Sequence, residues 1–369
     1  FPPALLVVGW LAPALGFYGF LAAFLLAFST KALHILQAMQ QGLKKFKQFS
    51  SAHVTSSLLA AIASVIGASF FSNGVTAVFL RALAILLVAV GGLIYLNRFG
   101  RMTRKAFDEM WIYSKPITFA AFASTLIVVV DKYFLAAFSS MSSLGRYDIS
   151  LALVSAILPF TVSLTMAMLP EVARHPEKIL SYYPRISIAN TAFLSAFGLT
   201  LYYYADIIIN VLLGSEYVAG AVPLLRILAL ALPAMSFLGL NSSVYCAIGK
   251  PKASAFFAAS LVITNIVFNA LLVPDYGAKG AAVATLCTYF VIAVASTVML
   301  WRRVRVGIRK TVLQLALFAL FAAGYWLLDD PGFTVKTLLL LAFALATLAL
   351  QRKMAAEVIE TVKEFLPAK

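Results

Sequence analysis

Hydrophobic residues in this chain are gathered into long blocks instead of alternating with polar residues. Each block is roughly 18–28 residues long, which is the length that an α-helix needs to cross a hydrocarbon core of ~30 Å. Short alternating strands of the kind that form membrane barrels are absent from the pattern. The blocks predict transmembrane helices at 15–41, 51–71, 75–96, 115–138, 147–170, 184–213, 221–248, 252–273, 280–301, 311–328 and 334–351.

This pattern predicts an all-α, polytopic membrane protein with about eleven full spans. One more apolar stretch, 4–12, is too short to span a bilayer and is interpreted as an N-terminal partial helix. Because the first residue is Phe1 and not Met, we expect the chain to be N-terminally truncated. Composition supports the membrane class, since 62% of the 369 residues are hydrophobic and 12% are charged, whereas a soluble domain carries about 25% charged residues.

Positive charge dominates the polar segments, with 29 Lys and Arg against 14 Asp and Glu. A nucleic-acid-binding protein gathers its basic residues on one soluble face, whereas here they lie in alternate gaps between the apolar blocks. Short cytoplasmic loops retain Lys and Arg. The distribution therefore predicts no nucleic-acid partner, a location in the inner (cytoplasmic) membrane, and basic loops and a C-terminus that face the cytoplasm.

The sequence offers no set of residues typical of an enzyme or a metal site. Its two cysteines, Cys246 and Cys287, fall inside apolar blocks and lack metal-ligand spacing. It contains no nucleotide-binding loop, no Ser/His/Asp set and no long extramembrane segment. We therefore expect neither a metal nor a cofactor, and we expect the protein not to be an enzyme.

Several segments of the second half resemble the polysaccharide-biosynthesis flippases, which form the oligosaccharide-lipid branch of the multidrug/oligosaccharidyl-lipid/polysaccharide (MOP) exporter superfamily. The order and spacing of the segments match, closely over 115–300 and loosely elsewhere. The segments are IVVVDKYFLAAF (127–138) with GRYDISLAL (145–153), MAMLPEVAR (166–174), VLLGSEYVAGAVPLLRILALALP (211–233), YCAIGKPKA (245–253) and NIVFNALLVPDYGAKGAAVATL (265–286).

The resemblance implies a MOP/MATE-like transporter with two six-helix bundles around a central cavity and alternating access. We expect the chain to divide accordingly into 1–97, the remainder of the N-terminal bundle; 98–114, a basic cytoplasmic linker; 115–310, the complete second bundle; 311–351, two additional helices; and 352–369, an amphipathic cytoplasmic tail on the membrane surface.

Six charged residues fall well inside predicted spans, away from the first three residues of each, where each costs roughly 2.5–3.5 kcal/mol and usually faces a cavity or a partner. Arg81 and Lys31 are candidates for a cationic cavity wall that binds the phosphate of a lipid-linked sugar, because Arg forms bidentate hydrogen bonds to phosphate. Arg226 is a third candidate, although it lies near enough to the interface to snorkel. Internal salt bridges of Arg81 or Arg226 with Asp131 or Asp206 are the alternative.

The carboxylates have two interpretations of their own. Asp131 is a candidate coupling site for H⁺ or Na⁺, since a semi-buried carboxylate changes its proton affinity readily. Its neighbour Lys132 favours a plain structural ion pair instead. Asp206 has the same two interpretations: it is either an ion-coupling site or a member of a structural ion pair.

Uncharged polar residues also dot the predicted spans. His34, Gln37 and Gln41 share one helical face at spacings of three and four, where they can contact sugar hydroxyls. Asn241 and Asn265 are candidates for the same role. Hydrogen bonding between helices explains all five equally well.

Together these features predict a flippase or exporter that moves a lipid-linked saccharide across the cytoplasmic membrane as a monomer, with membrane lipids around it. A multidrug (MATE-type) cation antiporter and a lipid II flippase of the same superfamily are the alternatives. An antiporter of organic cations needs an acidic cavity, whereas the spans here hold four basic and two acidic residues. The balance favours an anionic substrate.

Overall fold

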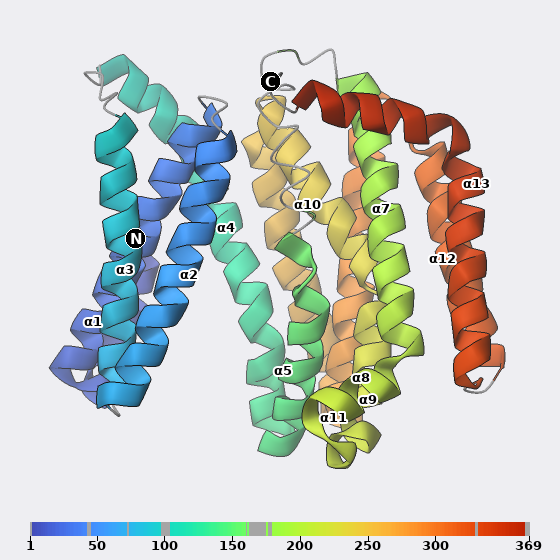
Figure 1. Cartoon of the computed structure of the whole chain (residues 1–369), viewed down its shortest axis with the longest axis horizontal. Helices are drawn as coiled ribbons and strands as arrows, with labels where there is room; N and C mark the ends of the chain where they lie inside the picture. Colours follow the sequence, from blue (N-terminus) through green and yellow to red (C-terminus); the bar gives the residue numbers. More distant parts are fainter. Residues whose placement is uncertain are drawn as a thin grey trace. The chain divides into compact units, whose positions relative to one another are not determined.

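The computed structural model describes residues 2–42, 46–71, 74–96, 104–159, 161, 175, 179–328 and 331–365. Every regular element within these ranges is a helix, which confirms the all-α fold class (Figure 1). The chain divides into two compact units, Phe1–Thr103 and Arg104–Lys369. The division falls inside the stretch expected to be the basic linker, and each unit is described by itself below.

Unit 1 is a bundle of three helices in which the third packs against both others. α1 spans Pro2–Gly42, α2 spans Phe46–Phe71 and α3 spans Gly74–Leu96. The short stretch 4–12 is continuous with the first predicted span, because both lie within α1. The buried core of this unit consists of Leu33, Leu36, Ala60, Ile85 and Ala89.

Unit 2 is a larger helical bundle whose helices pack around two buried clusters. α11 runs along α4 and α10, α5 packs on α9, and α12 packs on α7. Its helices are α4 (Arg104–Phe138), α5 (Met141–Ser155), α7 (Ile179–Tyr203), α8 (Ala205–Leu213), α9 (Ser215–Ala229), α10 (Leu232–Ala247), α11 (Pro251–Val304), α12 (Arg309–Leu327) and α13 (Phe333–Phe365).

Two of the predicted spans, 252–273 and 280–301, are the two helical arms of α11, which meet at Gly277. This residue is non-helical, with φ 54° and ψ −131°. The chain turns back there, since a Cβ on Gly280 would lie 2.2 Å from the carbonyl oxygen of Leu272. Glycine adopts positive φ at little cost, and Pro274 just before it cannot donate a helical hydrogen bond. The turn expected between the two spans therefore lies at Gly277.

Two further predicted spans are broken. The span at 184–213 is divided into α7 and α8 at Tyr204, and the span at 221–248 is divided into α9 and α10. The second break bends the chain by 43°. Pro233 lies in the first turn of α10, where a missing N–H is tolerated because those groups have no helical partner.

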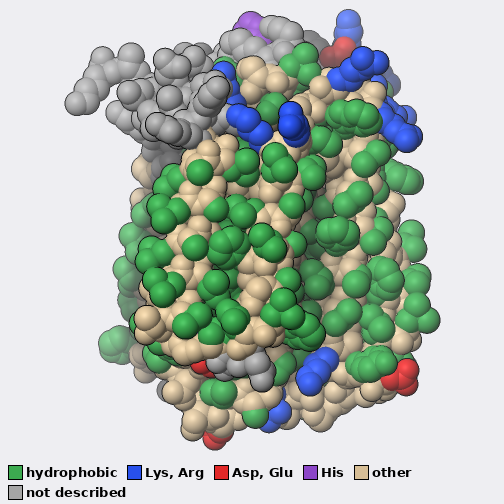
Figure 2. Space-filling view, turned by 90° about the vertical axis from the view of Figure 1, so that its right-hand side faces the viewer, with side chains coloured by type: hydrophobic (Ala, Val, Ile, Leu, Met, Phe, Trp, Pro, Cys, Tyr) green, Lys and Arg blue, Asp and Glu red, His purple; other side chains and the backbone are tan. Residues whose placement is uncertain are grey.

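The outer surface of the helices is apolar along most of their length. Eight helices within the described residues are long and apolar enough to cross a membrane, and α9 with α10 supplies one broken span. In Figure 2, which faces the side of α12 and α13, hydrophobic side chains form a broad band, and Lys and Arg gather along its upper edge. A continuous apolar band of this extent requires lipid around it. The protein is a multi-pass membrane protein.

The eight apolar helices are fewer than the eleven predicted spans for two reasons. Two of those spans are the two arms of α11, which are counted together as one helix although Gly277 separates them. The span predicted at 147–170 begins in α5, but most of its second half lies outside the described residues.

Candidate functional site

A polar cavity of about 230 Å³ lies among the three helices of unit 1. We call it the cationic pocket, because Arg81 of α3 is among its lining residues. α1 contributes His34 and Gln37, which share a helical face at a spacing of three. His53 of α2 faces them, and its Nδ1 lies 3.1 Å from Nε2 of Gln37. The neighbouring Ser56 and Ser57 add two hydroxyl groups.

The positive charge of the cationic pocket is not neutralised within unit 1. Residues 1–103 contain no Asp and no Glu, and the first acidic residue of the chain is Asp108. Arg81 lies seven residues past the start of α3, which is about 10 Å into the helix. A guanidinium at that depth is costly unless it meets an anion or water. An anionic ligand in the pocket is therefore favoured by charge.

Only some of the residues expected to line a cavity in this region are brought together. Arg81, His34 and Gln37 line one pocket, whereas Lys31 lies on α1 with an exposed side chain and does not line it. The side chain of Gln41 lies outside the described residues. Sequence analysis missed His53, although the polar run SAHVTSS (51–57) interrupts an otherwise apolar helix and marks the place.

A second polar cluster, which we call the Asp131 cluster, is buried in unit 2. Asp131 of α4 is 2% exposed. Its Oδ2 accepts hydrogen bonds from the hydroxyls of Tyr147 and Thr285, the latter at 2.8 Å, and its Oδ1 accepts one of 2.7 Å from Nδ2 of Asn269. Asn265 lies one turn from Asn269 and receives a hydrogen bond of 2.9 Å on its backbone oxygen. The cluster thus joins α4, α5 and both arms of α11.

The Asp131 cluster contains buried amide oxygens that lack a donor. Oδ1 of Asn269 and both Oδ1 and Nδ2 of Asn265 have no hydrogen-bond partner among the described residues, and both side chains are fully buried. A buried polar atom without a partner is costly, and it marks a place where water or an ion fits. Carboxylate and amide oxygens are the ligands that hard cations prefer. The donor set therefore suits a small monovalent cation or a proton.

The ion pair expected between Asp131 and Lys132 does not form. Nζ of Lys132 lies 2.5 Å from Oδ1 of Asp148 on α5, and both of these side chains are partly exposed. Successive residues on a helix point about 100° apart, so Lys132 leaves the core while Asp131 enters it. The only partners of Asp131 among the described residues are neutral hydrogen-bond donors.

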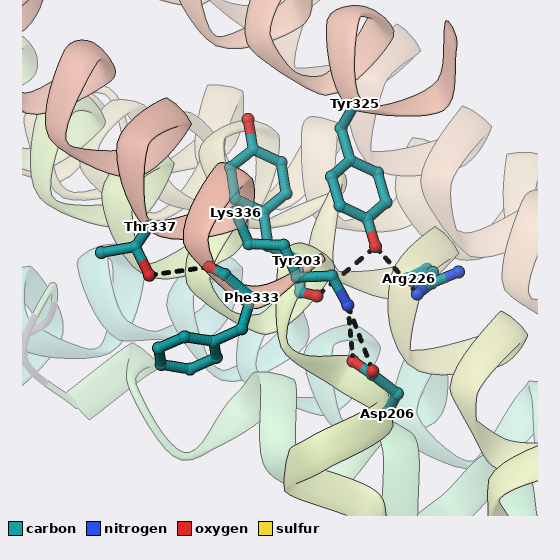
Figure 3. Close-up of polar contacts among 7 residues, drawn as sticks. All are labelled: Tyr203, Asp206, Arg226, Tyr325, Phe333, Lys336 and Thr337. Carbon is teal, nitrogen blue, oxygen red and sulfur yellow. Dashed lines mark hydrogen bonds and ion pairs between the residues drawn. The ribbon is translucent and has the colours of Figure 1, made fainter. Parts of the chain in front are cut away.

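Asp206 also has a partner that sequence analysis did not name. Nζ of Lys336 in α13 lies 3.3 and 3.1 Å from its two carboxylate oxygens (Figure 3). Arg226 donates a hydrogen bond of 3.0 Å to the hydroxyl of Tyr325, whose ring stacks on Tyr203 with centroids 4.7 Å apart. This group, which we call the Lys336 cluster, attaches α12 and α13 to α7, α8 and α9. Among the described residues, the carboxylate of Asp206 thus forms an ion pair with Lys336.

Asn241 is held by hydrogen bonds to neighbouring helices. Its Oδ1 accepts a hydrogen bond of 2.8 Å from Tyr183, and its Nδ2 donates to Ser296 and Thr297 at 2.9 Å each. The side chain is fully buried. These contacts correspond to the alternative of hydrogen bonding between helices.

A family profile described as Polysaccharide biosynthesis protein matches residues 12–222, which is more than half of the chain. The chain belongs to the polysaccharide biosynthesis protein family. The matched range begins in α1 and ends in α9, so it includes the unit that holds the cationic pocket as well as Asp131.

Among curated proteins, two membrane proteins of Methanocaldococcus jannaschii are similar to this chain. Uncharacterized membrane protein MJ1068 is 24% identical over 195 residues, which are 51% of this chain and 38% of that protein. Uncharacterized membrane protein MJ1375 is 28% identical over 176 residues, which are 48% of this chain and 42% of that protein. The matches span less than half the length of either relative.

Solved structures of transporters share the fold. Lipid II flippase MurJ, in an inward closed conformation, superimposes with a TM-score of 0.66 at 18% identity, covering 94% of this chain and 75% of that one. A mutant of the Vibrio cholerae MATE transporter VcmN gives a TM-score of 0.67 at 16% identity, covering 82% and 73%. Both proteins belong to the MOP exporter superfamily, and the fold of this chain is of that type.

Proposed function

We propose that this protein is a flippase that moves a lipid-linked poly- or oligosaccharide across the cytoplasmic membrane by alternating access. The observation that carries the proposal is the cationic pocket, in which Arg81 has no carboxylate within its own unit. A lipid-linked saccharide has a phosphate or diphosphate between sugar and lipid. Arg binds phosphate through two parallel hydrogen bonds, and membership of a polysaccharide biosynthesis family favours a saccharide as the cargo.

The other side chains of the cationic pocket suit a sugar. His34, Gln37 and His53 carry donors and acceptors, and two serines add hydroxyls. A site that holds the phosphate with one cation and the sugar with neutral polar groups can release its cargo again, since it contains few charges. Transport, and not turnover of the cargo, is the activity that this composition supports.

Two alternatives keep the same fold. A cation antiporter, like the MATE transporters, requires a pocket that attracts organic cations, which a carboxylate-free unit with Arg81 does not favour. A lipid II flippase carries a cargo that also contains a phosphate linkage, and it differs from our proposal in the identity of the saccharide. The charge argument therefore separates the first alternative from the proposal.

We assign coupling to the Asp131 cluster. A carboxylate that is buried among neutral donors and lies beside two unpaired amide oxygens can bind a proton or Na⁺. Its donors come from α4, α5 and both sides of the kink in α11. Occupancy of the cluster would then bias how these helices pack, which is what coupling requires.

The basic loops and the C-terminus are proposed to face the cytoplasm. Arg309 and Lys310 begin α12, and Arg302 and Arg303 end α11 at the same edge of the bundle. In Figure 1 the last part of α13 turns and runs across this edge, as expected for a helix on the membrane surface. A fluorescent protein fused to the C-terminus should fluoresce, and an alkaline phosphatase fusion there should be inactive; the reverse result would contradict the orientation.

The test of function is flipping of a fluorescent polyprenyl-diphosphate saccharide in proteoliposomes, measured as the fraction of label that an external quencher reaches. Arg81→Gln should slow flipping by about tenfold or more, because a charged hydrogen bond is removed. Arg81→Lys should retain part of the rate, since the charge stays but the bidentate geometry is lost. Lys252→Gln, at an exposed basic residue of unit 2, is the control.

Equal rates in the Arg81→Gln variant and the wild type would contradict the proposal. Transport of cationic dyes by the same vesicles, without any flipping of the saccharide, would support the antiporter instead. Flipping of lipid II in preference to other lipid-linked saccharides would identify the second alternative.

A further inference from the structure

Two cavities of unit 2 meet at one residue on α12. The first, which we call the apolar groove, has a volume of about 630 Å³ and is lined almost entirely by hydrophobic side chains. The second, which we call the basic pocket, has a volume of about 380 Å³ and is lined by Arg185, Arg309 and Lys310 among others. Thr311 lines both. The two cavities are therefore neighbours on either side of Thr311, with opposite chemical character.

The apolar groove runs lengthwise along α12. Its lining extends from Thr311 to Trp326 on that helix, a distance of about 22 Å at the rise of an α-helix. α7 contributes Tyr202, α10 contributes Pro233, and the second arm of α11 contributes Val294. The groove is long, which suits an extended hydrocarbon chain better than a compact ligand.

The basic pocket lies at the end of the groove where α12 begins. Arg309 and Lys310 come from the first turn of α12, and Arg185 comes from α7. No acidic residue is among the described residues that line it, and Ser181 adds a hydroxyl. Figure 2 shows Lys and Arg concentrated along the same edge of the apolar band. Basic pockets between transmembrane helices at the cytoplasmic side are typical sites for anionic lipid headgroups.

We propose that the groove and the basic pocket together hold one anionic phospholipid of the cytoplasmic leaflet. The headgroup phosphate lies against Arg309, Lys310 and Arg185, and one acyl chain lies in the apolar groove. The charge of the pocket and its position next to the groove favour this occupant, because neither free phosphate nor a neutral lipid would use both. The site shares no residue with the cationic pocket, so it is independent of the proposed flippase activity.

The test is binding of phosphatidylglycerol, phosphatidylcholine and inorganic phosphate to the purified protein in detergent, measured by native mass spectrometry. Arg309→Gln/Lys310→Gln should weaken phosphatidylglycerol binding by about 10- to 30-fold and leave phosphatidylcholine unchanged. Arg302→Gln/Lys252→Gln removes two exposed basic residues that do not line the pocket. This control should change binding less than twofold.

A second variant tests the groove separately. Ala319→Phe places a ring in the groove at an exposed lining position, so it should weaken binding of the two-chain lipid without altering the weak binding of inorganic phosphate. Helix content and a single elution peak establish that each variant is folded. Three results would each overturn the proposal. The control variant could lose as much phosphatidylglycerol binding as the pocket variant, or the wild type could bind phosphatidylcholine as tightly as phosphatidylglycerol. The third is a bound polyprenyl phosphate that phosphatidylglycerol cannot displace.

Discussion

Nδ2 of Asn269 donates a hydrogen bond of 2.7 Å to Oδ1 of Asp131, although the two residues are 138 positions apart in the chain. The contact joins the first helix of unit 2 to the arm of α11 that precedes its kink. It also holds a carboxylate in a fully buried position without any cation among its described partners. We therefore expect Asp131 to contribute to the stability of the protein and to the coupling of transport, and two substitutions distinguish these roles.

Asp131→Asn should preserve the fold but abolish coupling. The new amide can still accept from Asn269 and can donate to the hydroxyls of Tyr147 and Thr285, which rotate to suit it. The negative charge that binds a proton or Na⁺ is lost. We expect normal purification but transport that no longer responds to a Na⁺ or pH gradient across proteoliposomes.

Asp131→Ala provides the contrast, because it removes the acceptor of three buried hydrogen bonds, and the contact between the hydroxyls of Tyr147 and Thr285 can replace only one of them. Each donor left without an acceptor costs about 1–3 kcal/mol, so this variant should unfold at a clearly lower temperature. Transport that still follows the gradient in Asp131→Asn would show that coupling resides elsewhere.

The Lys336 cluster should contribute to stability in an asymmetric way. Lys336 is 5% exposed and Asp206 is 34% exposed by side chain, so removing the negative partner of the more buried lysine costs more than removing the positive partner of the more exposed aspartate. Asp206→Asn should therefore destabilise the protein by about 1–3 kcal/mol and by more than Lys336→Met does. The double variant should cost less than the sum of the singles, as thermal unfolding in detergent will measure. Strict additivity would mean that the pair does not interact.

The turn of α11 should not tolerate a side chain at Gly280, which lies close to the backbone of Leu272. A Cβ on Gly280 would lie 2.2 Å from the carbonyl oxygen of Leu272, so Gly280→Ala must displace backbone at a cost of about 1–3 kcal/mol. Gly324, inside α12, has open space around its Cα. Gly324→Ala should leave the unfolding temperature unchanged or raise it slightly, since alanine favours the helix. Similar unfolding temperatures for both variants would contradict the expected crowding.

Filling the cationic pocket should block transport without unfolding unit 1. Ala61 lines the pocket and is exposed, so Ala61→Phe introduces a ring into the space proposed for the cargo. Ala68 is an exposed residue of the same helix that does not line the pocket. Ala68→Phe is therefore the matched control, and saccharide flipping should fall sharply in the first variant alone. A retained rate in Ala61→Phe would place the cargo elsewhere.

The amino-acid sequence by itself determined the class of the protein and the positions of most helices. Long apolar blocks encode spans locally, because each residue of a lipid-exposed helix contributes separately to the cost of insertion. The grouping of His34 with Gln37 was also predictable, since a spacing of three fixes a common helical face. The acid-free composition of unit 1 is likewise a property of sequence alone.

Tertiary structure decided which partner each charged or polar residue finds. Asp131 pairs with Asn269 and Thr285, and Lys336 pairs with Asp206, across separations of 130 to 154 residues. Hydropathy gives the depth of a residue along a span but not the rotation of its helix against its neighbours, and that rotation turned Lys132 toward Asp148. The kink at Gly277 likewise depends on packing, because a proline and a glycine only permit a bend that neighbouring helices must stabilise.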